Sequence, residues 1–243
     1  KNNSDNLQRI REDGVLRVLT RNGSTTYYEI QGSPAGFEYQ LALAFANHLN
    51  VELEMIPVVG LDEVFSGLME ERADFAAAGL SITPARQETL LFGPSYLSVK
   101  QLFIYNRDVN PKISSAKDLI GKQIHVIGNS AHVEQLLALQ KDHPELQWIE
   151  SRDLETIDLL EQLVDGQIDV TIVNSTEYYA NRAFYPSFRI AFSTGSPRKL
   201  AWAMTATPNN ASLIKEMTNF FKTYTDNGKL ARLIDRNFTF NER

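Results

Sequence analysis

Residues 71–86 read ERADFAAAGLSITPAR, and this stretch decides the fold class. A helix ends at its start, an aspartate follows, and a short apolar strand then leads through a turn into a new helix. Thr83 is the expected cap of that helix, with Pro84 at its first position. The same order of helix, aspartate and apolar strand returns at residues 166–173. Because the unit occurs in both halves of the chain, we expect two α/β lobes rather than one sheet.

Hydrophobic periodicity on both sides of this stretch alternates between the spacing of strands and that of helices. In the first half it predicts strands at 15–19, 51–58 and 74–78 and helices at 37–49 and 62–71. In the second half it predicts strands at 123–127 and 168–173, a helix after Gly128, and a helix that Asp153 caps and Gly166 ends. The apolar run 168–173 suits the middle of a parallel sheet. Helices at 209–221 and 229–237 are expected to pack back on the first lobe.

The composition is that of a globular protein, with 43% apolar and 22% charged residues among 243. A formal charge of -6 attracts neither phosphate backbones nor anionic lipid, so we expect no nucleic-acid partner. The chain has no cysteine, which excludes disulfides and thiolate metal sites. No stretch approaches the roughly 20 apolar residues of a membrane span, so we expect no transmembrane segment in it. Because a natural chain does not start at Lys1, we expect that an N-terminal segment, for example an export signal, has been removed.

Short motifs of catalysis are absent from the sequence: it has no G-x-G-x-x-G, no phosphate-binding P-loop, no G-x-S-x-G and no H-E-x-x-H. The four histidines lack the close spacing that zinc sites favour, so we predict no metal and no cofactor. Glycosidases need only one or two carboxylates beside a sugar, and Glu150 beside Ser151 is the one local pair to consider. Its place between a strand and a helix cap favours a solvated loop over catalysis.

Arg86 lies in the first turn of its predicted helix, where the partial positive charge of the helix N-terminus disfavours a cation. An anionic ligand would relieve this arrangement, because a carboxylate accepts two parallel hydrogen bonds from a guanidinium. Ser81 and the backbone N–H groups of the turn at Gly79 would supply further donors. A salt bridge between Arg86 and Glu88 is the equally open alternative.

A comparable turn occurs in the second half at Gly128, Asn129 and Ser130, which offers N–H groups and a hydroxyl at a helix start. Helix capping by Ser130 is the alternative explanation. If the two helix starts face one cleft, they form a clamp for a small anion. The sequence therefore predicts an anion-binding site built from both lobes.

Several motifs occur in the order that is typical of bacterial solute-binding protein family 3, and the resemblance covers nearly the whole chain. They are Gly14-Val15-Leu16-Arg17-Val18, Gly36-Phe37-Glu38-Tyr39, Ala73-Asp74-Phe75, residues 80–86, Phe92-Gly93-Pro94-Ser95-Tyr96 and Gly166-Gln167-Ile168-Asp169. The resemblance implies a two-lobed periplasmic binding protein-like fold of type II, with the ligand in the cleft. It places the lobes at 1–101 with 197–243 and at 102–196, joined by crossings near 99–103 and 195–199.

Residues 96–101 and the loop Thr26-Tyr27-Tyr28 look most like the N-terminal regulatory module of membrane-bound peptidoglycan lytic transglycosylases. This implies a periplasmic module whose parent is attached to the outer membrane. It also implies a separate C-terminal catalytic domain, a lyase of class EC 4.2.2.-, so this fragment itself is expected to be no enzyme. The alternatives are a free-standing amino acid receptor of an ABC importer and a hydrolase with unrecognised carboxylates.

The resemblance also assigns ligand-binding roles to individual residues. Arg86 matches the arginine that grips an amino acid's α-carboxylate, Ser81 the hydroxyl beside it, and Ser130 the clamp from the second lobe. Asn174 stands where amino acid binders usually have an aspartate for the ammonium group, and Leu61 where many have a stacking aromatic. Arg21 lies near another usual acid, so the amine side has lost negative charge. We therefore expect an amino acid or a muropeptide with a free carboxylate and an acylated nitrogen as the ligand.

Aromatic side chains are further candidates for the walls of the cleft. These are Tyr27, Tyr28, Tyr96 and Trp202, and a place in the core is the alternative for each. A ligand that bridges two lobes binds the closed form better than the open one, so it shifts the closure equilibrium. In a lytic transglycosylase, closure would be the signal that reaches the catalytic domain, and peptidoglycan would be the further partner.

Overall fold

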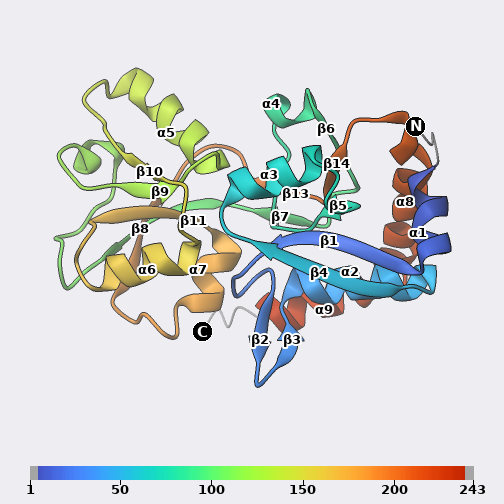
Figure 1. Cartoon of the computed structure of the whole chain (residues 1–243). Coiled ribbons are helices and arrows are strands. Elements are labelled where there is room, and N and C mark those ends of the chain that lie inside the picture. Colours follow the sequence, from blue (N-terminus) through green and yellow to red (C-terminus); the bar gives the residue numbers. More distant parts are fainter. Residues whose placement is uncertain (1–4, 239–243) are drawn as a thin grey trace. The chain divides into compact units, whose positions relative to one another are not determined.

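The two helix–aspartate–strand repeats lie in two separate units of the computed structural model, which describes residues 5–238 (Figure 1). Unit 1 contains the chain up to Val58, Glu63–Ser98, and the return from Lys199 onward. Unit 2 contains Val59–Asp62 and Val99–Arg198. The chain leaves unit 1 at β7 (Leu97–Val99) and returns at β13 (Arg198–Leu200), and these two short strands pair with each other.

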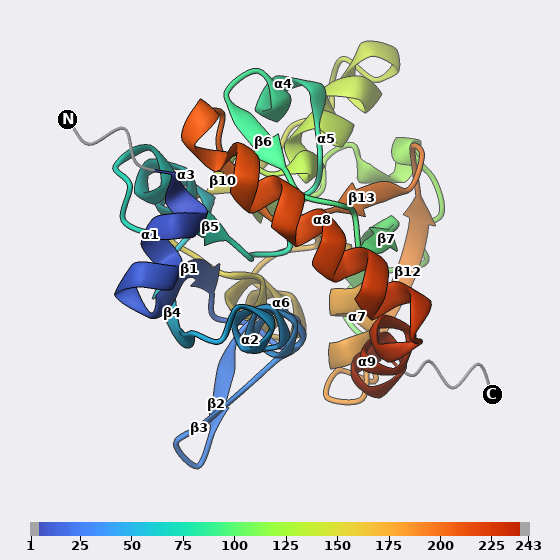
Figure 2. The same ribbon diagram turned by 90° about the vertical axis from the view of Figure 1, so that its right-hand side faces the viewer.

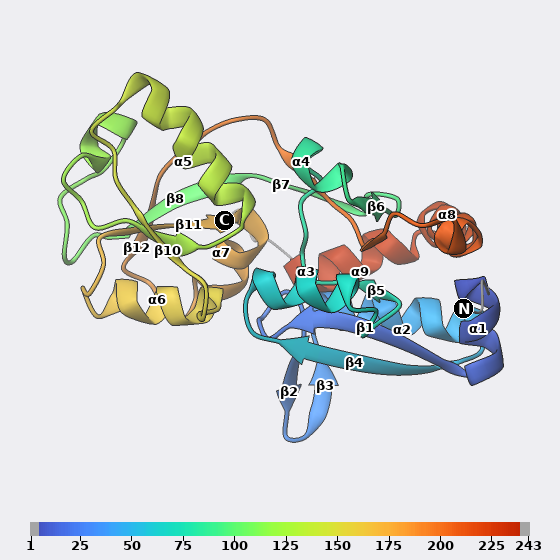
Figure 3. The same cartoon turned by 45° about the horizontal axis from the view of Figure 1, so that its top comes forward.

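Unit 1 is built on a five-stranded sheet with the order β4-β1-β5-β14-β6. Its strands are β1 (Val15–Arg21), β4 (Glu52–Val58), β5 (Phe75–Ala76), β6 (Leu90–Phe92) and β14 (Ala203–Thr205). β1 runs parallel to β4 and β5, whereas β14 runs antiparallel to β5 and β6. A hairpin of β2 (Tyr28–Ile30) and β3 (Ser33–Ala35) projects from the sheet (Figure 3).

The helices of unit 1 cover this sheet around an aromatic core. They are α1 (Asn6–Asp13), α2 (Phe37–Leu49), α3 (Leu61–Met69), α4 (Pro84–Gln87), the 3-10 helix η2 (Pro208–Asn210), α8 (Ala211–Asp226) and α9 (Lys229–Phe238). Trp202 is fully buried at the centre and stacks on Phe75, with ring centroids 4.6 Å apart. α8 contacts α1 and α9 contacts α2, so the two C-terminal helices pack on this unit as predicted (Figure 2).

Unit 2 has a three-stranded antiparallel sheet with the order β11-β8-β12 and a parallel pair of β9 and β10. Its strands are β8 (Gln101–Asn106), β9 (His125–Ile127), β10 (Ile149–Ser151), β11 (Val170–Asn174) and β12 (Phe188–Ser193). Its helices are the 3-10 helix η1 (Ala116–Leu119), α5 (Ala131–Asp142), α6 (Thr156–Val164) and α7 (Ser175–Asn181). α5 lies on one face of the strands, with α6 and α7 on the other (Figures 1 and 3). A cluster around Phe103, Val126 and Leu136 forms the core.

Three expectations about local structure were wrong. β11 was expected in the middle of a parallel sheet, but it pairs antiparallel with β8. Its parallel contact is a single bridge between Val170 and Ile124. Asp153 does not cap α6; Glu155 occupies that position and forms a capping box with Asp158. Finally, the helix that Thr83 caps is a single turn of four residues, so it has no extended dipole that acts on Arg86.

The two repeats hold the chain in the same way. Asp74 pairs with Arg17 of β1, where its backbone N–H donates to the Arg17 carbonyl and its carboxylate accepts the Arg17 N–H, both at 2.8 Å. Asp169 does the same with Gln123, at 2.9 and 2.8 Å. In each unit an aspartate thus locks the beginning of a strand to its parallel neighbour, which confirms that the sequence repeat is structural.

Candidate functional site

The segment from Gly79 to Arg86 lies in unit 1, directly after β5. Gly79 adopts a left-handed φ of 66°, which a residue with a side chain rarely adopts, and this turns the chain away from the sheet. Ser81 is buried and forms an antiparallel bridge with Leu200 of β13. The Ile82 N–H donates to the Lys199 carbonyl at 2.9 Å. The segment is therefore held as an extra strand against the chain where it re-enters unit 1.

Arg86 is half-buried and is brought to Ser81. Its Nη1 donates to the Ser81 carbonyl at 2.8 Å, and its guanidinium carbon lies 5.1 Å from the centroid of the Phe65 ring. Thr83 Oγ1 accepts the Arg86 backbone N–H at 3.2 Å, as expected of a cap. A carbonyl and an aromatic face therefore orient the guanidinium. A planar guanidinium held in this way can present parallel donors to a carboxylate.

Two of the candidate tyrosines lie at the base of the β2–β3 hairpin. Tyr27 is half-buried, its ring lies edge-on to Tyr39, and its hydroxyl donates to Glu29 at 3.1 Å. Burial and then this carboxylate raise the pKa of Tyr27 above its ordinary value. Tyr28 is exposed on β2. Both rings are thus available on the surface of unit 1 as contacts for a ligand.

Tyr96 and Trp202 instead belong to the core, the alternative that the sequence left open. Tyr96 is 4% exposed and Trp202 0% exposed. Both donate to one carboxylate that sequence reasoning missed, that of Glu38 in the first turn of α2: the Tyr96 hydroxyl bonds one oxygen, and Trp202 Nε1 lies 2.9 Å from the other. The motif at Gly36–Tyr39 marked the region, but nothing local to it shows which side chains meet Glu38.

In unit 2, Asn129 and Ser130 lie in the turn before α5. Asn129 has a left-handed φ of 57°, and its amide donates to Asp62 Oδ1 at 3.1 Å. Ser130 is the N-cap residue of α5, yet its hydroxyl donates to the Ile127 carbonyl at 2.6 Å. Asp62 also pairs with Arg152 at 2.7 Å, and this partner holds the pKa of Asp62 below its ordinary value. The turn is thus tied to residues 59–62, which include the buried Leu61.

Asn174 ends β11 and caps α7. Its backbone N–H donates to Glu177 at 3.0 Å in a capping box. In the antiparallel pair of β11 and β8, Asn174 lies opposite Gln101. Gln101 orients its amide nitrogen toward His132 Nδ1 at 2.8 Å and its oxygen toward Arg198 Nε at 3.2 Å. This buried polar group, also missed from the sequence, connects both crossing strands to the first turn of α5.

Arg21, the remaining departure from the family pattern, lies at the end of β1 in unit 1. Its Nη2 donates to the Ala78 carbonyl at 3.0 Å. Ala78 directly precedes Gly79, so this cation supports the strand end from which the candidate segment turns. The positive charge therefore lies beside the backbone that leads to Ser81.

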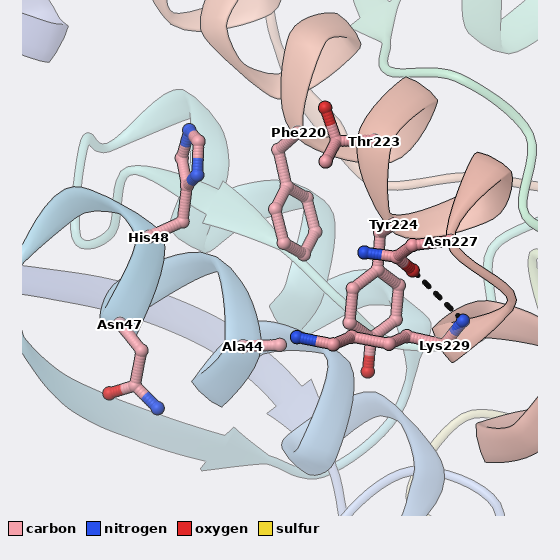
Figure 4. Close-up of a pocket in the computed structure, with 8 residues that line it drawn as sticks. All are labelled: Ala44, Asn47, His48, Phe220, Thr223, Tyr224, Asn227 and Lys229. Atoms are coloured by element: carbon pink, nitrogen blue, oxygen red, sulfur yellow. Dashed lines mark hydrogen bonds between the residues drawn. The ribbon is translucent and has the colours of Figure 1, made fainter.

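Two cavities in unit 1 are lined by other residues. One, of about 420 Å³, lies between α2 and α8, where the Phe220 and Tyr224 rings and the Lys229 side chain line it (Figure 4). The other, of about 680 Å³, is lined by polar side chains around Arg9, Arg17 and Asp74. Over residues 5–238, no three His, Asp or Glu side chains gather as metal ligands would, and no helix has the length and hydropathy of a membrane span.

Comparisons with known proteins agree over most of the chain. The family described as bacterial extracellular solute-binding proteins, family 3, matches residues 16–240. The membrane-bound lytic murein transglycosylase F of Saccharophagus degradans is 41% identical over 224 residues, which are 92% of this chain and 44% of that protein. Its Pseudomonas fluorescens counterpart is 40% identical over 231 residues, 95% of this chain and 47% of that protein. The chain thus spans about half the length of these relatives.

Solved structures share the fold. A mutant of ArgBP from T. maritima has a TM-score of 0.86 at 20% identity, covering 97% of this chain and all of that one. AbpA, an amino acid ABC transporter substrate-binding protein from Streptococcus pneumoniae bound to L-arginine, has a TM-score of 0.82 at 22% identity, covering 96% and 98%. These likenesses show the two-lobed α/β binding-protein fold. On the match to residues 16–240, the chain belongs to the bacterial extracellular solute-binding proteins of family 3.

Proposed function

We propose that this chain is the ligand-sensing module of a peptidoglycan lytic transglycosylase and is not itself catalytic. It binds an amino acid or a cell-wall peptide through the ligand's carboxylate and signals by closure. Relatives that are about 40% identical and twice as long are lytic murein transglycosylases, which supports the parent activity. The observation that carries the binding role is the Arg86 guanidinium, oriented by the Ser81 carbonyl and Phe65.

The carboxylate is recognised from unit 1. A guanidinium has five N–H donors in a rigid planar fork, and the bond to the Ser81 carbonyl sets the orientation of that plane. A ligand carboxylate in the plane accepts two parallel, charge-assisted bonds. Ser81 and the Gly79 turn border the same position, and Tyr27 and Tyr28 supply aromatic surface for the rest of the ligand.

Unit 2 has candidate ligand contacts of its own. In this proposal they are Asn129 and Ser130 at the start of α5, Leu61, and Asn174 at the end of β11. Asn174 is neutral, so it forms only an uncharged hydrogen bond with the ligand nitrogen. An acylated nitrogen suits it better than an ammonium group, which favours a stem peptide of the cell wall over a free amino acid.

Closure then couples the ligand to the rest of the parent protein. A ligand that binds the closed form better shifts the closure equilibrium by its difference in affinity. Coupling of this kind between two sites is typically about 1–3 kcal/mol. In the parent protein, which we place in the periplasm with attachment to the outer membrane, the signal reaches a catalytic domain C-terminal to this chain.

Calorimetry on three proteins tests the carboxylate site. The probes are L-arginine and an N-acetylated cell-wall stem peptide, and the proteins are the wild type, Arg86→Ala and Arg72→Ala. Arg72 is a matched control because it is an arginine of unit 1 that pairs with Glu70. We expect Arg86→Ala to lose about 2–5 kcal/mol of binding free energy, at least a 30-fold weaker Kd. Equal binding by Arg86→Ala and wild type would reject the site, and tight binding of L-arginine without the peptide would reject the acylated ligand.

The alternative function is a free-standing amino acid receptor of an importer. The observation in its favour is the fold shared with the arginine-bound AbpA. The gene that encodes the chain separates the two proposals, because a downstream lytic domain in the same reading frame excludes the importer receptor. Release of soluble fragments from purified peptidoglycan by this chain alone would contradict both and favour an enzyme.

A further inference from the structure

Glu38 is a buried acceptor at the junction of three segments of unit 1. It is 1% exposed and accepts a hydrogen bond from the Tyr96 hydroxyl on one oxygen and from Trp202 Nε1 on the other. One donor on each oxygen suits the ionised form, because an ionised carboxylate is an acceptor only. A buried charge of this kind is stable only while these donors remain in place.

The donors come from the parts of unit 1 that form the candidate site. Ala201, which precedes Trp202, donates its N–H to the carbonyl of Leu80 at 3.1 Å, in the segment that carries Ser81 and Arg86. Tyr96 lies just before β7, where the chain leaves the unit, and its N–H donates to the Leu200 carbonyl at 3.2 Å. Trp202 follows β13, where the chain returns. Glu38 is therefore a common anchor for the site segment and for both chain crossings.

We propose that Glu38 is a positioning residue of the ligand site: its ionised carboxylate holds Trp202, and through the bond between Ala201 and Leu80 it sets the Ser81 carbonyl that orients Arg86. This inference rests on the proposed carboxylate site, because Glu38 itself, buried beneath it, does not touch the ligand. Leu80 directly precedes Ser81, so a shift of Trp202 and Ala201 moves the Ser81 carbonyl that Arg86 bonds at 2.8 Å.

Protonation of Glu38 is the natural perturbation of this anchor. The charged or titratable groups that face it are Tyr96 from the chain before β7 and Arg21 from β1, and Trp202 is a neutral donor. Burial raises the pKa of Glu38 to about 7, against the opposing effect of its hydrogen bonds and of Arg21. The pKa of Tyr96 is raised well above its ordinary value, so Tyr96 stays protonated near neutral pH. A protonated Glu38 has less acceptor capacity, which weakens its hold on the donors.

An NMR titration of the ligand-free chain from pH 5 to 9 tests the anchor. The signals are the Ala201 amide, the Trp202 indole N–H, the Arg86 Nε–H and the Glu38 carboxyl carbon. We expect all four to shift with one common midpoint near 7. In Glu38→Gln the first three should not titrate there, whereas in Asp74→Asn, which alters another buried carboxylate of unit 1, the midpoint should remain.

Two results would overturn the inference. In one, the Glu38 carbon and the Trp202 indole N–H titrate together while Arg86 stays constant, which leaves Glu38 with a role in the core only. In the other, Arg86 keeps its titration in Glu38→Gln. Should that variant fail to fold, the wild-type carbon signal still shows whether Arg86 follows Glu38.

Ligand affinity gives a second measurement. If only the ionised anchor presents Arg86 correctly, the apparent Kd scales inversely with the ionised fraction, so the N-acetylated stem peptide should bind about tenfold more weakly at pH 6 than at pH 8. Glu38→Gln should show no such change. Absence of stem-peptide binding at every pH counts against the proposed ligand, whereas the NMR titration decides on Glu38 without any ligand, so the two failures are distinguishable.

Discussion

Replacing Glu38 with glutamine should remove a specific pH dependence from the stability of unit 1. In the folded chain the pKa of Glu38 is about 7, compared with its ordinary value of 4.5. Between these values the folded state binds the proton more tightly than the unfolded state, so the contribution of Glu38 to stability falls as the pH rises. That contribution is fully present below pH 4.5, is lost by about pH 7, and is constant above that.

The size of the effect follows from the separation of the two pKa values. A difference of one pKa unit corresponds to 1.36 kcal/mol. The free energy of unfolding should therefore decrease by about 3 kcal/mol between pH 4.5 and 7 on account of Glu38 alone. Other carboxyl groups titrate in the same range, and the pKa of Asp62, for example, is lowered by Arg152. These contributions are common to the wild type and Glu38→Gln, so they cancel in the difference between the two proteins.

Urea unfolding at several pH values between 4 and 8 measures this difference. Trp202 fluorescence reports on unit 1, and a Trp148→Phe background removes the other tryptophan, which packs in unit 2. We expect the wild type to lose about 3 kcal/mol relative to Glu38→Gln from pH 4.5 to 7. Two parallel stability curves would refute the reasoning, because they would show that burial does not raise the pKa of Glu38.

Four further variants address the packing of each unit. In urea unfolding, Asp74→Ala should lower the free energy of unfolding by about 2–4 kcal/mol and Asp169→Ala by about 1–2 kcal/mol. The loss is larger for Asp74 because it is more buried and also binds Arg9 at 2.7 Å. Equal losses, or a larger loss for Asp169→Ala, would contradict this account. Gly36→Ala should cost about 3 kcal/mol or more, since φ is 115° and a Cβ there would lie 2.3 Å from the Thr26 carbonyl oxygen; an unchanged melting temperature would exclude that clash. Thr83→Val, which removes the acceptor for the Arg86 N–H, should cost about 1 kcal/mol and weaken ligand binding in calorimetry, and wild-type affinity would show that the cap does not orient Arg86.

Local patterns in the sequence predicted most of the helices and several of the strands. β1, α2 and β4 lie within a few residues of their expected bounds. Each buries one face, and the spacing of apolar residues along the chain shows whether that face belongs to a helix or a strand. The cap at Thr83 was predictable because it depends on residues three positions apart. The repeat around Asp74 and Asp169 was visible because each aspartate stands directly before its strand.

Only the tertiary structure decided which distant residues meet. Glu38 lies 58 positions from Tyr96 and 164 from Trp202, and no local pattern records such pairings. Strand direction was equally hidden: β11 is buried on both faces, so it has the same apolar run beside the antiparallel β8 as it would have in a parallel sheet. The sequence alone determined the helices, the strands and the cation at Arg86, because these depend on neighbours along the chain. The buried acceptor beneath that cation emerged only when the chain was packed, because a hydrogen bond depends on distance in space and not on separation in sequence.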